Sequence, residues 1–201
     1  LKKTESIDVM DAVGSNIRID TYGWEVKRVL PIINENINEE WISDKTRYAC
    51  DGIKNQRIDV PYVKSKKGFE KISWEEANKI IVKKINDTSP DKIAGFTGDL
   101  TNMETLYVAK EFFNKTIKSK YLDSRINNTY VNTSNKENYI FNSKINGIED
   151  SDLIVLVGTN PRIEATIVNL RIRKSYLKNN LEVYSIGNVG DLTYPYEILP
   201  N

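Results

Sequence analysis

The chain of 201 residues contains no histidine and a single cysteine, Cys50. Without histidine, neither Ser-His-Asp nor Cys-His catalysis can be assembled within the chain. Histidine-ligated zinc, haem and iron sites are excluded for the same reason. One thiolate is too few for an iron–sulfur cluster, which normally takes four, and too few for an internal disulfide. We therefore interpret Cys50 as a small packing residue rather than a nucleophile.

Long hydrophobic runs and an excess of one charge are also missing. The longest apolar run, at 153–157, has the length of a buried strand and falls far short of the about 20 residues that cross a bilayer. The 29 basic and 28 acidic residues leave a net charge of +1, which gives no electrostatic footprint for nucleic acid or anionic lipid. Two short basic clusters are interpreted as solvated surface: Lys64, Lys66 and Lys67 in a loop, and Arg171, Arg173 and Lys174 in a helix.

Residues 1–65 predict a small β-rich region around one helix. The segments 15–20 and 25–31 flank the turn-like Thr-Tyr-Gly and are typical of a hairpin. A helix is predicted over 38–52, with Asn38 as its N-cap and two glutamates near its positive end.

Residues 66–201 alternate helix and strand patterns, which indicates a doubly wound, mostly parallel sheet in a three-layer α/β domain. We interpret this part as a partial Rossmann-like domain. The predicted elements are a helix over 74–85 capped by Ser73, a strand over 92–98, a helix over 103–114, a strand over 152–158, a helix over 161–177 and a strand over 181–187.

The best candidate site is the turn Gly-Thr-Asn-Pro-Arg at 158–162, between the strongest strand and the strongest helix. Ligands of doubly wound sheets bind beyond the carboxyl ends of the strands. Backbone amides at a helix start can hold an anion, but the same residues also make a good strand-to-helix turn. The turn is neither a P-loop nor a GxGxxG motif, so nucleotide binding has no direct support. A second turn over 186–194 could line the same edge, whereas the acids at 149–152 are interpreted as a solvated loop.

Three longer strings carry a resemblance to a known family. They are KKTESIDVMDAVGSNIRID at 2–20, VLPIINENINEEWISDKTRYACDGIKNQR at 29–57 and LIVLVGTNPRIEATIVNLRIRKSYL at 153–177. Together they resemble the 75 kDa iron–sulfur subunits of mitochondrial and alphaproteobacterial complex I, in their second, molybdopterin-oxidoreductase-like half. The resemblance extends from about residue 2 to about residue 195.

The resemblance implies a non-catalytic structural part in the peripheral arm of respiratory complex I. It implies no catalytic residue, metal ligand or cofactor in this chain, with iron–sulfur clusters and FMN in neighbouring parts of the complex. The implied partners are other peripheral-arm subunits, especially the ferredoxin-like iron–sulfur half of the same subunit, with no nucleic acid and no direct membrane insertion. The implied location is the matrix side of the mitochondrial inner membrane, or alternatively the cytoplasmic face of a bacterial inner membrane.

The resemblance also implies what has been lost. It identifies residues 1–65 as a β-rich remnant of the subdomain that carries a cluster in molybdopterin oxidoreductases. In related molybdenum enzymes a GxNP-type turn contacts the pterin cofactor, and Gly158, Asn160 and Pro161 match that turn. Because mitochondrial-type members have lost the cofactor, we interpret these residues as a vestigial, structural turn. The family's domain continues well beyond the point matching Asn201, so we expect a reduced domain or one completed by another polypeptide. The alternatives are a molybdopterin-type oxidoreductase acting on formate or a similar small substrate, and a generic nucleotide-binding α/β protein.

Overall fold

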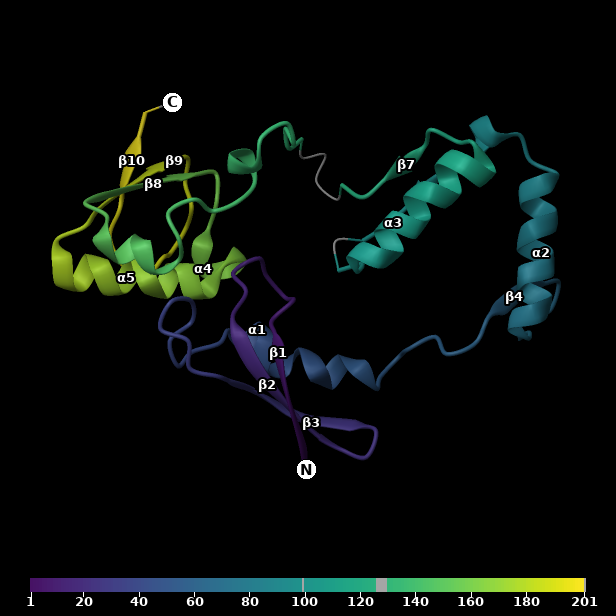
Figure 1. Cartoon of the computed structure of the whole chain (residues 1–201), viewed down its shortest axis with the longest axis horizontal. Coiled ribbons are helices and arrows are strands. Elements are labelled where there is room, and N and C mark those ends of the chain that lie inside the picture. Colours follow the sequence, from purple (N-terminus) through teal and green to yellow (C-terminus); the bar gives the residue numbers. More distant parts are fainter. Residues whose placement is uncertain (99, 126–129, 201) are drawn as a thin grey trace. The chain divides into compact units, whose positions relative to one another are not determined.

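The computed structural model describes residues 1–98, 100–125 and 130–200. The chain divides into two compact units (Figure 1). Unit 1 is made of Leu1–Asn55 and Asn132–Asn201, and unit 2 is made of Gln56–Val131. This division does not test the predicted domain boundary at residue 65, which stays a prediction.

Unit 1 begins with an antiparallel sheet of order β1-β2-β3, formed by β1 (Lys2–Ile7), β2 (Asn16–Tyr22) and β3 (Glu25–Pro31). The hairpin predicted around Thr-Tyr-Gly is confirmed as the β2–β3 pair. Successive side chains of a strand alternate between faces, so one face of the sheet is apolar. Ile17 and Val29 from that face pack with Ile42 into a buried cluster.

The predicted helix over 38–52 is wrong in its first part. The structure has a short helix α1 (Asp44–Tyr48), followed by a 3-10 turn (Ala49–Ile53), and Ser43 caps α1 by accepting from the Thr46 amide at 3.1 Å. Asn38 is not an N-cap. Its buried side-chain amide instead donates to the carbonyls of Ile32 and Trp41, at 3.0 and 3.1 Å. These bonds hold a non-helical loop before Ser43.

The second part of unit 1 is a parallel sheet of order β10-β9-β8. Its elements are β8 (Leu153–Val157), α4 (Pro161–Glu164), α5 (Thr166–Asn179), β9 (Glu182–Ile186) and β10 (Glu197–Leu199), preceded by 3-10 turns at Lys136–Asn138 and Asn146–Asp150. The order of strand, helix and parallel strand confirms the predicted α/β class. The single helix predicted over 161–177 is interrupted at Ala165, whose φ of −150° is not helical.

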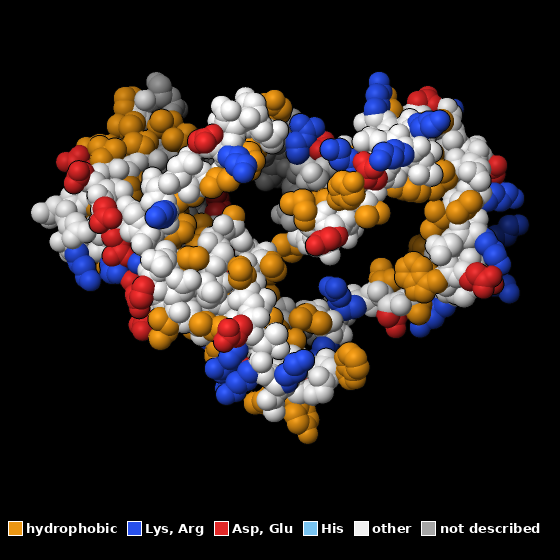
Figure 2. Space-filling model, viewed as in Figure 1, with side chains coloured by type: hydrophobic (Ala, Val, Ile, Leu, Met, Phe, Trp, Pro, Cys, Tyr) orange, Lys and Arg blue, Asp and Glu red, His pale blue; other side chains and the backbone are white. Residues whose placement is uncertain are grey.

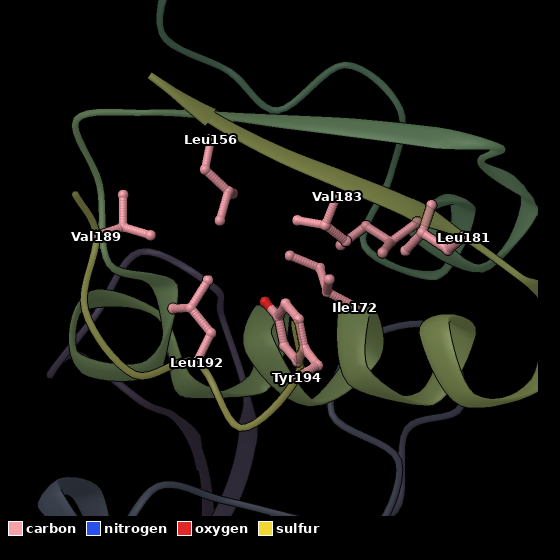
Figure 3. Packing of buried hydrophobic residues seen from close by; sticks show 8 residues of the cluster. Leu156, Ile172, Leu181, Val183, Val189, Leu192 and Tyr194 are labelled. Atoms are coloured by element: carbon pink, nitrogen blue, oxygen red, sulfur yellow. The ribbon is translucent and has the colours of Figure 1, made fainter. Parts of the chain in front are cut away.

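Helix α5 covers one face of this parallel sheet. Figure 3 shows Ile172 of α5 directed toward the strand residues Leu156 and Val183, and each of the three is at most 6% exposed. Leu181, Val189, Leu192 and Tyr194 complete the cluster around them. Full burial of one such aliphatic side chain contributes about 1.5–3 kcal/mol, so this cluster is the main apolar core of the unit.

Unit 2 has less buried structure. Its elements are a hairpin of β4 (Tyr62–Ser65) and β5 (Gly68–Lys71), helix α2 (Trp74–Asn86), a 3-10 turn (Pro90–Lys92), β6 (Gly95–Phe96), α3 (Met103–Glu111), a π-helical turn (Phe112–Ile117) and β7 (Leu122–Asp123), which pairs in parallel with β6. Ser73 caps α2 as predicted. The strand predicted over 92–98 is shorter in the structure, where β6 covers two residues. A Cβ on Gly95 would lie 2.4 Å from the Phe113 ring, so this position has no room for a side chain.

Candidate functional site

The turn after β8 lies where the sequence placed the candidate site, at the carboxyl end of the parallel strands. Gly158 has a φ of +60°, a conformation that favours glycine, and its amide donates to the Ile186 carbonyl at 3.2 Å. Pro161 is buried at the first position of α4, where its missing N–H needs no partner. Both residues are therefore explained by the strand-to-helix connection itself.

Asn160 links this turn to the following loop. Its side-chain amide donates to the Val189 carbonyl at 2.6 Å, and a Cβ on Gly190 would lie 3.4 Å from the same nitrogen. The prediction that the 186–194 turn lines the same edge as 158–162 is thereby confirmed. The other side-chain atom, Asn160 Oδ1, is buried and has no hydrogen-bond partner in the described structure.

An ion pair between Arg162 and Asp191 lies at the same edge of the sheet. Arg162 donates to the Asp191 carboxylate at 2.5 Å and to the Asp191 carbonyl at 3.3 Å. The backbone amide of Thr193 and the Arg162 guanidinium both lower the pKa of Asp191 below its ordinary value. The one arginine of the turn is therefore paired internally rather than held open for a ligand anion.

Glu164 fills the position that an anion would take at the helix start. Its carboxylate accepts from the Thr159 hydroxyl at 2.6 Å and from the Asn160 amide at 3.3 Å. With Asp191 it places two carboxylates at this edge, and like charge disfavours a phosphate there. The residues present do not fit a phosphate-bearing pterin cofactor.

Beneath the edge lies a buried polar link that the sequence did not indicate. Asn169 of α5 donates to the Leu192 carbonyl at 3.1 Å and accepts from the Tyr194 hydroxyl at 2.8 Å. Burial raises the pKa of Tyr194, so its hydroxyl stays protonated and can donate. Nothing in the local pattern around an asparagine within an amphipathic helix signals such a long-range partner.

The residues also fail to fit an iron–sulfur cluster. Cys50 is the one thiol of the chain, and its side chain packs against the apolar cluster of Ile17, Val29 and Ile42. Within residues 1–98, 100–125 and 130–200, no group of three or more His, Cys, Asp or Glu side chains is placed to hold a metal ion. A cluster needs about four protein ligands, so none can be built around Cys50 alone.

Three local interpretations of charged residues are wrong. Arg171 does not belong to a solvated basic face, because its side chain is only 4% exposed and pairs with Glu39 and Glu149. Glu39 does not serve a helix end, and Glu149 does not lie in a purely solvated loop. The partners lie 132 and 22 residues away along the chain, beyond the reach of local pattern analysis.

No helix among the described residues combines the length and apolar character needed to cross a membrane.

Two family models match the chain. Residues 57–201 match the molybdopterin oxidoreductase family, and residues 1–51 match the NDSU1/NuoG-like 4Fe-4S domain of NADH-ubiquinone oxidoreductase. The second match is to a domain whose name includes a cluster that the residues here cannot ligate.

Curated relatives match nearly the whole chain. The 78 kDa mitochondrial subunit of NADH-ubiquinone oxidoreductase from Candida albicans is 47% identical over 96% of the chain, which corresponds to 27% of that relative. The 75 kDa subunit from Reclinomonas americana is 44% identical over 100% of the chain and 31% of its own length. The iron-sulfur protein 1 of NADH dehydrogenase from Solanum tuberosum, a mitochondrial protein, is 44% identical over 99% of the chain and 27% of its own length.

The chain thus spans between a quarter and a third of the relatives that it matches. Its similarity to the 75/78 kDa subunits confirms the resemblance found in the strings around 2–20, 29–57 and 153–177. Because a family model covers residues 57–201, more than half of its length, this protein belongs to the molybdopterin oxidoreductase family.

Proposed function

We propose that the chain is a structural, non-catalytic part of the large iron–sulfur subunit in the peripheral arm of respiratory complex I. The observation that carries this proposal is identity of 44–47% to 75/78 kDa subunits over nearly the entire chain. In this role the chain takes part in NADH-to-ubiquinone electron transfer by helping to assemble the complex, without performing a chemical step itself.

The site geometry supports a chain without its own cofactor. The vestigial turn of Gly158, Asn160 and Pro161 is held by its own neighbours, and Glu164 takes the amide that a ligand anion would need. The single thiol of Cys50 supplies a quarter of the ligands that a cluster normally takes. The iron–sulfur clusters and FMN of the proposed complex are therefore assigned to neighbouring parts.

The proposed partners are other peripheral-arm subunits, foremost the ferredoxin-like iron–sulfur half of the same subunit. The proposed location is the matrix side of the mitochondrial inner membrane, supported by relatives whose names include mitochondrial. The near-neutral net charge of +1 favours protein partners over nucleic acid.

Native electrophoresis of solubilised membranes tests this proposal directly. Each gel slice is analysed by mass spectrometry for peptides of this chain and stained for NADH dehydrogenase activity. Co-migration with the active band supports the structural role and identifies the neighbouring chains. Migration as a small separate species, with none in the active band, would contradict it.

The molybdopterin-type oxidoreductase is a second candidate on one observation, against the poor fit of Glu164 and Asp191 to a phosphate-bearing cofactor. Asn160 Oδ1 is buried without a partner among the described residues at the carboxyl ends of the parallel strands, where doubly wound sheets bind ligands, and an acceptor without a donor costs free energy. Elemental analysis for molybdenum and fluorescence analysis for oxidised pterin, on chain purified from its own cells, distinguish the two. Stoichiometric molybdenum and pterin would favour the enzyme, and their absence favours the structural role.

A further inference from the structure

Arg171 is an unusually buried cation for a helix that lies over a sheet. Its side chain is 4% exposed, and four of its contacts are to a segment that lies more than 130 residues earlier. The guanidinium donates twice to the Ile37 carbonyl, at 3.2 and 3.1 Å, and once to the Glu35 carbonyl at 2.5 Å. A side chain of α5 thus hydrogen-bonds directly to backbone carbonyls of the loop after β3.

Carboxylates complete the surroundings of this cation. Arg171 also bonds Glu39, at 3.1 Å, and Glu149. Lys174, one turn further along α5, bonds the same two carboxylates, with 2.9 Å separating its Nζ from Glu149 Oε2. Two cations and two anions therefore form one neutral cluster, and planar guanidinium donors suit a site that must serve several acceptors at once.

The loop that receives Arg171 is itself constrained. Asn34 and Glu39 exchange backbone hydrogen bonds of 3.0 and 2.8 Å. Glu39 has a φ of +49°, a backbone conformation that residues other than glycine rarely adopt. The carbonyls of residues 35 and 37, in the same loop, both accept from the Arg171 guanidinium. Such strain persists only where the surroundings hold it, and here the ion cluster does so.

The two apolar clusters of unit 1 share no residue. One contains Ile17 and Val29 of the antiparallel sheet, and the other contains Leu156 and Ile172 of the parallel-sheet region. Contact between the two regions through the 34–39 loop is polar, with the Arg171 cluster buried and a 3.2 Å bond from Asn146 to Asn36 exposed. A buried cation that loses its partners is far more costly than an exposed one.

We propose that Arg171 is a clasp that makes the antiparallel-sheet region and the parallel-sheet region of unit 1 unfold as one cooperative unit. Its acceptors come from both regions: those of Glu35, Ile37 and Glu39 lie in the loop after β3, and the Glu149 carboxylate precedes β8. The clasp acts through the geometry of these contacts and takes no part in electron transfer. This inference concerns the chain's own fold and stands apart from the proposed function.

Hydrogen exchange of the full chain in increasing denaturant, read by mass spectrometry of peptides, tests the clasp. In the unaltered chain, peptides covering β2–β3 and β8–β9 are expected to lose protection at the same denaturant concentration. In Arg171→Met, the β2–β3 peptides are expected to lose protection first, with opening at least about 10-fold easier than that of β8–β9. Arg173→Met is the matched control, because Arg173 lies on the same helix and donates to the Thr193 carbonyl at 2.8 Å instead.

Two further variants keep the test informative if Arg171→Met does not fold. Glu149→Gln removes one charge of the cluster while retaining the shape of the side chain, and it is expected to separate the two transitions partially. Arg171→Lys keeps the charge but loses the planar fork, and it is expected to fall between the unaltered chain and Arg171→Met. Two separate transitions already in the unaltered chain, or a single transition in every variant, would overturn the clasp.

Discussion

Unit 1 and unit 2 have similar shares of regular structure but very different burial. Unit 1 contains both apolar clusters, including Ile172 and Leu181 at 2% exposure. Among the described residues of 56–131, the buried side chains are Ala77, Ile117 and Ser119. Helix α2 leaves Ile80 and Ile81 at 45% and 51% exposure, and Figure 2 shows hydrophobic side chains on the surface over α2 and α3.

The difference shows that a sequence can form a stable helix locally without burying the apolar side chains of that helix. Helix α2 has a complete capping box and a lysine–glutamate pair between Lys79 and Glu75 at 2.7 Å, so local interactions favour it. Local terms of this kind supply a few tenths to about 1 kcal/mol each, whereas burial of apolar area dominates stability. Unit 1 is therefore expected to provide the stable part of the fold.

The largest expected contrast is in amide hydrogen exchange without any mutation. Because α5 and β9 enclose an apolar core and α2 does not, amides of β9 are expected to be protected at least about 100-fold more than amides in the middle of α2. Exchange measured by NMR or by mass spectrometry of peptides reports both in one sample. Equal protection would mean that unit 2 is stabilised by contacts as strong as those of unit 1.

Ile172→Ala would attack the core of unit 1. Its side chain is 2% exposed between α5 and the sheet, so its truncation is expected to cost about 2–5 kcal/mol of unfolding free energy. Ile81→Ala in α2 is the matched change in unit 2 and is expected to cost less than about 1 kcal/mol, since that side chain is already 51% exposed. Urea titrations followed by tryptophan fluorescence and circular dichroism measure both, and equal costs would contradict the comparison.

Ser73→Ala would remove the N-terminal cap of α2 and so test local stabilisation in unit 2. The Ser73 hydroxyl accepts from the Glu76 amide at 3.2 Å, and Glu76 accepts from the Ser73 amide at 3.0 Å. Loss of this cap is expected to destabilise α2 by about 1 kcal/mol and to leave unit 1 unchanged. Exchange rates of the first α2 amides report the loss, and Asn102→Ala, which uncaps α3, should affect α3 instead.

The smallest expected effect is a dependence of unit 1 on acid pH. Bonds from Arg18 and then Arg28 lower the pKa of Asp20 to about 2. Because the folded carboxyl has a pKa below its unfolded value of about 4, it stabilises the fold above that value and loses this contribution as pH falls from about 4 toward 2. Asp20→Asn is expected to flatten this part of the profile of melting temperature against pH, and an unchanged slope would show that other carboxyls determine it.

Much of the fold follows from patterns that operate over a few residues. The alternation in 15–20 and 25–31 predicts the β2–β3 hairpin, and Ser73 with two following glutamates predicts the start of α2. The apolar run at 153–157 predicts β8, and the glycine after it predicts the turn of the candidate site. These signals are readable because backbone conformation and side-chain alternation are set locally.

Other features depended on partners distant in the chain. Asparagine is a common helix cap, yet the Asn38 side-chain amide donates to the carbonyls of Ile32 and Trp41. The sequence predicts the turn that contains Asn160, but the hydrogen bond from its side-chain amide to the Val189 carbonyl required the loop after β9 to be in position. No local rule states which of several suitable hydrogen-bond partners a side chain will meet.

The sequence by itself determined that the chain offers no histidine and a single thiol, against the four thiolates that an iron–sulfur cluster normally takes. It also determined the α/β succession of the parallel sheet. Only the tertiary structure decided that Arg171 is buried with Glu39 and Glu149 rather than solvated. The physical reason is that charge and helical propensity are properties of a residue, whereas desolvation and pairing are properties of the place to which the whole fold carries it.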